Sequence, residues 1–244
     1  MPTALIGHGG FIGANLAAQA HFDEKVDARG VESIRGKSFR LLVCAPDPAA
    51  DREELQRLAA SLREVKAEKL LLVSTVDVYP RPEAVDEDSP IDLSATATPR
   101  GRHLRELELS CAEHFSATVL RLPLLFGPGL ERNLLLDLLS DREVENIHPD
   151  GVFQYYAVAH LWRDANIALE RGLPLLNLAA EPIPTRELAL RCFGRELTAY
   201  PASAPAVSDV RSKHAPLWGG ERYLYSKERV LQEIADFVEK ERAL

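Results

Sequence analysis

The sequence predicts an α/β protein: a Rossmann-like, doubly wound parallel sheet with a small C-terminal substrate-binding region. Short apolar strands alternate with helical patterns through the first half of the 244 residues, which is typical of a parallel sheet covered on both faces. Evenly spaced glycines follow the first strand, where a helix begins. Beyond Pro128 the pattern loosens. We therefore expect a core over residues 1–130, partly completed by residues 153–190, and a smaller region over residues 131–244 that does not fold on its own.

The first half should be a compressed version of this fold. Buried strands and amphipathic or small-residue helices are predicted in alternation at residues 3–7, 13–22, 40–46, 51–65 and 69–75. Between Phe22 and Phe39 there is room for one weak strand over residues 24–28 and a helical turn or two. A further full strand–helix unit does not fit there.

The second half is predicted from its periodic runs and caps. A helix over residues 100–115 follows an acidic loop, and the apolar run over residues 117–127 is typical of a single strand. Further helices are expected at 130–140, at 158–172, after Thr185 and after Ser226, with Gly172 in the C′ position of the second.

Composition excludes several classes of protein. The formal net charge of −8 argues against a general nucleic-acid-binding or acidic-membrane surface. No apolar run approaches the roughly twenty residues that span a bilayer, and the start lacks the features of a signal peptide. The cysteines lie apart in apolar runs without metal-type spacing, at Cys44, Cys111 and Cys192. We expect a cytoplasmic protein with reduced core cysteines and no metal.

The glycine motif points to a nucleotide. Gly7, Gly10 and Gly13 fall between a strand and a helix, where glycine permits a tight turn, close approach of a pyrophosphate and close helix–strand packing. The helix N-terminus, with Phe11 and Ile12, then offers free N–H groups to phosphates. The alternative is a glycine turn that only packs tightly.

Four stretches together resemble one family. "GHGGFIG", "LLLVSTVDVY", "LRLPLLFGPG" and "LLNLAAEPIPTRELA" are similar, in this order, to motifs of the extended short-chain dehydrogenase/reductases, which include the sugar-nucleotide epimerases and dehydratases. The resemblance covers roughly residues 3–190. It implies an NAD or NADP cofactor and a small-molecule substrate such as a nucleotide-sugar. It also implies pairing of relatives through helices equivalent to 51–66 and 100–115, so a homodimer is possible, although the same stripes suit a monomer core.

The resemblance assigns the remaining cofactor positions. Ala45 and Ser74, near the ends of two strands, are expected at the cofactor. In the family an acidic residue after the second strand accepts from the ribose 2′-OH of NAD, whereas an arginine pairs with the 2′-phosphate of NADP. This chain offers both, Asp27 and Arg29, which on a strand would share a face. Alternatively they pair with each other, and the choice between NAD and NADP stays open.

The family's proton-transfer pair is missing. Relatives use a Ser/Thr to hold the substrate hydroxyl, a Tyr to transfer its proton, and a Lys that makes the Tyr competent near neutral pH. Thr75 matches the first position, but alignment without a gap puts Arg100 and Leu104 in place of Tyr and Lys, with Glu108 in the expected acidic place. Arginine does not act as a base at neutral pH.

Other side chains are candidates for the missing roles. His103 is a candidate because histidine changes charge near neutral pH, although an exposed helix histidine is the plainer interpretation. Arg100 and its neighbours Arg102 and Arg105 are alternatively an anion clamp or a solvated cluster. Substrate contact is expected from residues that match family positions near the cleft, Tyr79, Asn133, Tyr155 and Tyr156. Alternatively Tyr79 has a structural role, since it packs beneath the cofactor in relatives, and the two adjacent tyrosines belong to the core.

Two functions remain open. The first is an atypical NAD(P)-dependent oxidoreductase, epimerase or dehydratase acting on a nucleotide-sugar-like substrate, with Thr75, His103 and Arg100 as catalytic residues. The second is a catalytically inactive protein that binds a dinucleotide or sugar nucleotide as a regulator or scaffold. Fold alone does not choose between them, since function depends on the site.

Overall fold

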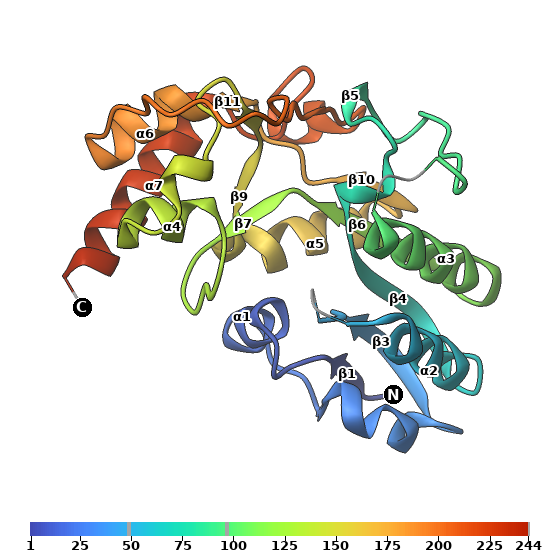
Figure 1. Cartoon of the computed structure of the whole chain (residues 1–244). Helices are drawn as coiled ribbons and strands as arrows, with labels where there is room; N and C mark the ends of the chain where they lie inside the picture. Colours follow the sequence, from blue (N-terminus) through green and yellow to red (C-terminus); the bar gives the residue numbers. More distant parts are fainter. Residues whose placement is uncertain (48–49, 96–97, 244) are drawn as a thin grey trace. The chain divides into compact units, whose positions relative to one another are not determined.

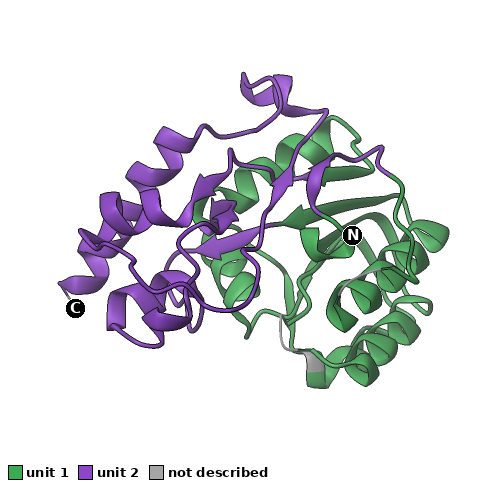
Figure 2. Ribbon diagram, turned by 45° about the horizontal axis from the view of Figure 1, so that its top comes forward, with its two compact units in different colours: residues 1–81, 90–122, 159–176 green, residues 82–89, 123–158, 177–244 purple. Residues whose placement is uncertain are grey.

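A computed structural model of the chain describes residues 1–47, 50–95 and 98–243. These residues form two compact units that interleave along the sequence (Figure 2). Unit 1 contains residues 1–81, 90–122 and 159–176, and unit 2 contains residues 82–89, 123–158 and 177–244.

Unit 1 is built on a six-stranded sheet in the order β10-β6-β4-β3-β1-β2 (Figure 1). The strands are β1 (Thr3–Ile6), β2 (Glu24–Val26), β3 (Ser38–Cys44), β4 (Lys66–Thr75), β6 (Ala117–Leu122) and β10 (Leu175–Asn177). The pairs β1–β2, β1–β3, β3–β4 and β4–β6 are all parallel. The predicted doubly wound α/β fold is confirmed.

The expected compression of the first half is also confirmed. A six-stranded doubly wound sheet of the common type has two strands on one side of its first strand. Here only the three-residue β2 lies on that side, at the sheet edge, and the 3₁₀ segment η1 (Ala28–Ile34) follows it in place of another strand–helix unit. The order reverses at β1, so the crevice where such folds bind ligands opens beyond the carboxyl ends of β1 and β3.

Alternation along the strands gives the sheet two apolar faces. Leu42, Leu70 and Leu72 pack in one cluster with residues of α2 (Arg52–Leu62) and α3 (Pro99–His114). The intervening Val43 and Leu71 are equally buried and lie outside that cluster. On the face of the sheet that bears Val43 and Leu71, α1 (Phe11–Gln19) packs beside α5 (Leu161–Glu170) (Figure 1). The 3₁₀ turn η4 (Val158–His160) precedes α5.

Unit 2 contains short strands and the C-terminal helices. Its strands are β5 (Glu83–Val85), β7 (Leu124–Phe126), β8 (Val152–Phe153), β9 (Tyr155–Ala157), β11 (Ile183–Pro184) and β12 (Asp209–Val210). They pair as β7–β9, β8–β11 and β5–β12. The helices are α4 (Leu134–Ser140), α6 (Thr185–Phe193) and α7 (Lys227–Arg242), with 3₁₀ turns η3 (Val144–Asn146) and η5 (Ala215–Trp218), while η2 (Val76–Val78) belongs to unit 1.

Three sequence predictions of local structure are wrong. The run 117–127 is two strands, because Pro123, which has no N–H for a ladder, separates β6 from β7. The helix expected over 130–140 begins only at Leu134, after its cap Asn133. Thr185 does not cap α6; Pro184 takes the cap position, and the Thr185 hydroxyl donates to the carbonyl of Gly151.

Other predictions hold. Gly172 follows α5 with φ of +63°, as a C′ glycine does, and the Ser226 hydroxyl caps α7 by accepting from the amide of Arg229. Cys44, Cys111 and Cys192 are free and buried, and burial raises the pKa of the Cys111 thiol to about 12.

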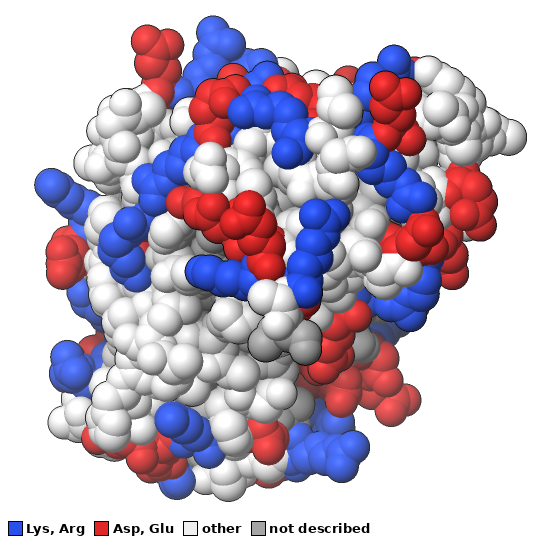
Figure 3. All heavy atoms as spheres, turned by 90° about the vertical axis from the view of Figure 1, so that its left-hand side faces the viewer, with Lys and Arg blue, Asp and Glu red and all other residues white. Residues whose placement is uncertain are grey.

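No helix in residues 1–47, 50–95 and 98–243 has the length and apolar character to cross a membrane. On the face in Figure 3, acidic and basic side chains are interspersed.

Candidate dinucleotide and ligand site

The glycine turn after β1 has no room for side chains. Gly7 has φ of +85°, and a Cβ there would lie 2.0 Å from the carbonyl oxygen of Ala45, at the end of β3. A Cβ on Gly13 would lie 1.9 Å from the carbonyl oxygen of Gly7. Both contacts are far shorter than real Cβ atoms show, so each glycine is required by the close packing of turn, helix and strand. Ala45 therefore supports the turn through its backbone.

The helix that follows offers its amino end without a side-chain cap. α1 spans nine residues from Phe11, its N-cap is Gly10, and no side-chain hydrogen bond closes it. No acidic residue lies in its first turn, so nothing from the helix itself competes for the positive end of the dipole. Phe11 is half-buried, while Ile12 is buried and fixes this helix on the core.

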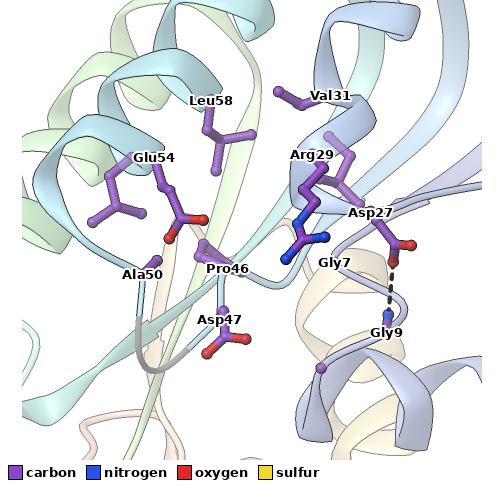
Figure 4. Close-up of a pocket in the computed structure, with 13 residues that line it drawn as sticks. Gly7, Gly9, Asp27, Arg29, Val31, Pro46, Asp47, Ala50, Glu54 and Leu58 are labelled. Atoms are coloured by element: carbon purple, nitrogen blue, oxygen red, sulfur yellow. Dashed lines mark hydrogen bonds between the residues drawn. The ribbon is translucent and has the colours of Figure 1, made fainter.

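A pocket of about 360 Å³ lies beside this turn (Figure 4). Its lining comes from the glycine turn, η1, the end of β3 and the start of α2: Ile6, Gly7, Gly9, Gly10, Asp27, Arg29, Val31, Pro46, Asp47, Ala50, Glu54, Leu55 and Leu58. Val31 and Leu58 lie at one end of the pocket, and Asp27 and Asp47 lie toward the other (Figure 4). An apolar slot with a few convergent polar groups is the usual form of a small-molecule site.

Asp27 and Arg29 both line this pocket, but not as the sequence predicts. β2 ends at Val26, so Asp27 is the N-cap of η1 and Arg29 lies within η1 rather than on a shared strand face. No ion pair joins these two residues of the described chain. The Asp27 carboxylate instead accepts from the amide of Gly9 at 3.2 Å and lies 3.1 Å from Nδ1 of His8.

Ser74, expected at the cofactor, is part of a buried network at the end of β4. Its hydroxyl donates to Oε1 of Glu108 at 2.6 Å. Both Glu108 oxygens also accept from Arg121, Oε1 from Nε at 3.0 Å and Oε2 from Nη2 at 2.7 Å. Glu108 and Arg121 are only 2% and 1% exposed. Burial alone would lower the pKa of Arg121, but its hydrogen bonds and proximity to Glu108 outweigh this and raise it.

Tyr79 belongs to the same network. Its hydroxyl accepts from Nη1 of Arg121 at 2.8 Å, and the guanidinium carbon lies 4.9 Å from the centre of the ring. The side chain is buried. Tyr79 therefore links the end of η2 to β6.

Thr75 and Arg100 both contact Asp77, the first at its backbone and the second at its side chain. The Thr75 hydroxyl oxygen accepts from the amide of Asp77 at 3.2 Å, and Nη1 of Arg100 lies 3.7 Å from Oδ2 of Asp77. A Cβ on Gly101 would lie 2.1 Å from the Asp77 carbonyl oxygen, so the first turn of α3 presses on η2. Leu104, in the family's Lys position, is buried in the core between α2, α3 and the sheet.

His103 lies elsewhere. It lines a groove between α2 and α3, together with Leu55, Ala59 and Leu107. None of the glycine-turn residues lines that groove, and neither do Thr75 and Arg100.

The substrate candidates of unit 2 have structural surroundings. Tyr155 and Tyr156 are buried in β9, and burial raises the pKa of the Tyr155 phenol far above its ordinary range. Asn133 caps α4 by accepting from the amides of Leu135 and Leu136, and its Nδ2 donates to the carbonyl of Leu125.

The sequence alone misses part of the site. Asp47 and Glu54 supply two further carboxylates to the pocket, from the segment after β3 and from the first turn of α2 (Figure 4). A recognisable signal exists for Glu54, which forms a capping box with Asp51. The sequence contains Arg121 within the motif "LRLPLLFGPG", but it does not indicate that Arg121 pairs with Glu108.

Comparison with solved structures identifies the architecture. The chain is similar to MoeE5 in complex with UDP-glucuronic acid and NAD, at 15% identity and a TM-score of 0.76, over 100% of each chain. It is also similar to UDP-glucose 4-epimerase with UDP-glucose from Thermotoga maritima, at 15% identity and a TM-score of 0.75, over 100% of this chain and 99% of that one. A third is UDP-N-acetylglucosamine 4-epimerase from Methanobrevibacter ruminantium in complex with UDP-N-acetylmuramic acid, at 12% identity and a TM-score of 0.74, over 98% and 97%.

Neither a scan against models of protein families nor a search of curated proteins finds a match. The sheet order, the glycine turn and the structural similarity together define a Rossmann-type α/β protein. Its fold is that of the extended short-chain dehydrogenase/reductases, as the sequence motifs predict.

Proposed function

We propose that this chain binds a nicotinamide adenine dinucleotide at the glycine turn and recognises a nucleotide-sugar-like ligand without the family's proton-transfer pair. The observation that carries the proposal is the cradle after β1. Gly7 and Gly13 leave no space for a Cβ, and the amino end of α1 is uncapped by any side chain. Such a turn favours a pyrophosphate through backbone N–H groups and the helix dipole.

The pocket supports NAD more strongly than NADP. Asp27, Asp47 and Glu54 place three carboxylates along it, against the single guanidinium of Arg29. A 2′-phosphate would bring further negative charge to this lining, whereas a free 2′-OH can donate to a carboxylate. Asp27 is the best placed acceptor, because the amide of Gly9 holds its carboxylate beside the turn.

The test is a titration of the protein with NADH and NADPH, followed by energy transfer from its tryptophans to the reduced nicotinamide. NADH is expected to bind at least about tenfold more tightly than NADPH. Asp27→Asn should narrow this difference, while Glu24→Gln, on β2 and outside the pocket lining, leaves it unchanged. Absence of binding by both dinucleotides would overturn the proposal.

The site supports ligand binding better than turnover. Arg100 and Leu104 replace the Tyr and Lys, and the candidate substitutes are engaged elsewhere. His103 lies in the α2–α3 groove, and the Tyr79 hydroxyl accepts from Arg121. We therefore propose a dinucleotide- and sugar-nucleotide-binding protein rather than an epimerase or dehydratase.

Turnover is tested by incubating the protein and NAD with UDP-glucose and following absorbance of reduced nicotinamide and epimer formation. No conversion above the protein-free rate is expected. Conversion by the wild type that is lost in a His103→Gln variant would restore the enzyme interpretation.

A further inference from the structure

We propose that His8 is a positioning residue of the dinucleotide site, whose imidazole fixes the Asp27 carboxylate and thereby sets the preference for NADH over NADPH. This inference rests on the proposed function and adds a determinant of its cofactor specificity. Asp27 lines the pocket beside the glycine turn and His8 does not, so His8 acts through Asp27.

The glycine turn over residues 7–10 carries one side chain, that of His8, since the other three residues are glycines. A Cβ on Gly9 would lie 2.8 Å from Oδ1 of Asp27, so the absence of a side chain there lets this carboxylate approach the backbone of the turn. Nδ1 of His8 lies 3.1 Å from the same oxygen, and the imidazole is 34% exposed. The turn therefore contacts Asp27 both through its backbone and through its side chain.

The buried nitrogen of His8 carries a hydrogen. Nδ1 is shielded from solvent and makes no aligned hydrogen bond with the part of the chain that the structure describes, so its contact with Asp27 is an electrostatic one. A bare nitrogen would set its lone pair against those of the carboxylate oxygen, whereas an N–H attracts that oxygen. Movement of the carboxylate away from Nδ1 would leave a buried donor without any acceptor, which costs free energy. His8 therefore favours the observed place of Asp27.

The two oxygens of Asp27 have different surroundings. Oδ1 accepts from the amide of Gly9 at 3.2 Å and faces His8 (Figure 4). No hydrogen bond joins Oδ2 to a residue within 1–47, 50–95 and 98–243, and the side chain is 59% exposed. Oδ2 is thus the oxygen that can accept from a ribose hydroxyl of a ligand.

A fixed carboxylate discriminates between the two dinucleotides. Held at the turn, Asp27 accepts from the free 2′-OH of NADH and repels the 2′-phosphate of NADPH. A released Asp27 could turn toward solvent and leave the guanidinium of Arg29, which also lines the pocket, to pair with that phosphate. Loss of the His8 imidazole should therefore weaken NADH binding and strengthen NADPH binding.

A histidine that served only as a positive charge would have the opposite effect. Its removal would leave the carboxylates of the pocket less compensated, so NADPH, which carries the additional phosphate, would lose more affinity than NADH. The direction of the change in the ratio of the two affinities therefore distinguishes positioning from neutralisation.

The experiment titrates NADH and NADPH into the wild type, His8→Ala, His8→Asn and His21→Ala, followed by energy transfer from tryptophan to the reduced nicotinamide. Asparagine keeps an N–H donor close to the place of Nδ1. His21 is a matched control, because its Nε2 lies 3.8 Å from Oδ1 of Asp23 and neither residue lines the pocket.

The wild type and His21→Ala are expected to bind NADH at least about tenfold more tightly than NADPH. His8→Ala should reduce this ratio to less than about threefold, and His8→Asn should keep most of it. In an Asp27→Asn background His8→Ala should change the ratio no further, because the two residues act as one unit. A merely structural effect on the turn would instead lower both affinities together in either background.

Equal loss of both affinities in His8→Ala, a ratio that rises or stays within about twofold of the wild type, or a further fall in the Asp27→Asn background would overturn the inference. Equal binding of the two dinucleotides by the wild type would overturn it as well.

A nitrogen-15 spectrum of the wild-type histidines tests the same contact if His8→Ala does not fold. A proton on Nδ1 of His8 and a change of its signal on addition of NADH are expected, whereas a proton on Nε2 alone or an unchanged signal would contradict the inference. NADH binding that does not depend on His8 refutes this inference alone, while failure of the wild type to bind either dinucleotide refutes the proposed function.

Discussion

The buried ion pair between α3 and β6 gives the sharpest stability prediction. Arg121→Met removes two hydrogen bonds to Glu108, one to the Tyr79 hydroxyl and the contact of the guanidinium with the Tyr79 ring. Of the described residues, the Glu108 carboxylate, 2% exposed, then keeps Ser74 and Arg105 as partners. Breaking a buried pair from one side typically costs about 3–5 kcal/mol, because a charge remains buried without its counter-charge.

The expected loss for Arg121→Met is therefore at least about 3 kcal/mol in the free energy of unfolding, measured by urea denaturation followed by circular dichroism. Arg105→Met serves as the control. Its guanidinium contacts the same carboxylate at 2.8 Å but is 26% exposed, so solvent screens the pair and about 1 kcal/mol or less is expected.

The double variant Glu108→Leu/Arg121→Met separates charge from packing. Neither charge of this pair remains in it, so it should unfold at no lower urea concentration than Arg121→Met alone. A loss below about 1 kcal/mol for Arg121→Met, or simple additivity in the double variant, would refute the role assigned to this pair.

Three further predictions concern other parts of the chain. Gly13→Ala should abolish NADH binding or folding, because its Cβ would lie 1.9 Å from a carbonyl oxygen. Gly30→Ala, where the atom nearest to a Cβ is 3.9 Å away, should leave the free energy of unfolding within about 0.5 kcal/mol of the wild type, measured by urea denaturation. Gln154→Leu should cost about 2–4 kcal/mol in the same assay, because the buried amide of Gln154 pairs both backbone groups of Val210; a smaller loss than about 1 kcal/mol would contradict this. Burial would raise the pKa of Asp209, but its arginine and tyrosine partners outweigh this and lower it. That carboxylate therefore stabilises the fold above its unfolded pKa of about 4 and loses the effect as the pH falls below it, so Asp209→Asn should show a flatter decline of melting temperature between pH 6 and pH 3.

The fold could be predicted because its signals are local and mutually consistent. The apolar strand, the glycine spacing and the small-residue helix at residues 3–22 lie next to one another in the sequence, so their physical roles are visible there. The short segment after Phe22 likewise limits what can form, and the single edge strand β2 follows from that length. The break at Pro123 was missed because the apolar run continues through it, and only the pairing of each half with a different sheet reveals two strands.

The site was harder to predict, because its charges come from segments far apart in the chain. Asp27, Asp47 and Glu54 line one pocket but belong to separate segments, and nothing in the sequence indicates that they converge. The hydrogen bond of Ser74 to Glu108 was not predicted for the same reason. A hydroxyl at a strand end is compatible with a cofactor contact, and only the packing of α3 on β4 directs it to Glu108 instead.

The sequence departs from the family's motif at Arg100 and Leu104, and the structure gives a physical reason for the second of these residues. The buried pair of Glu108 and Arg121 fixes α3 against the sheet, and Gly101 permits contact of the first turn of α3 with the backbone of Asp77. Leu104 is integrated into the apolar core, so the Lys position now stabilises the fold.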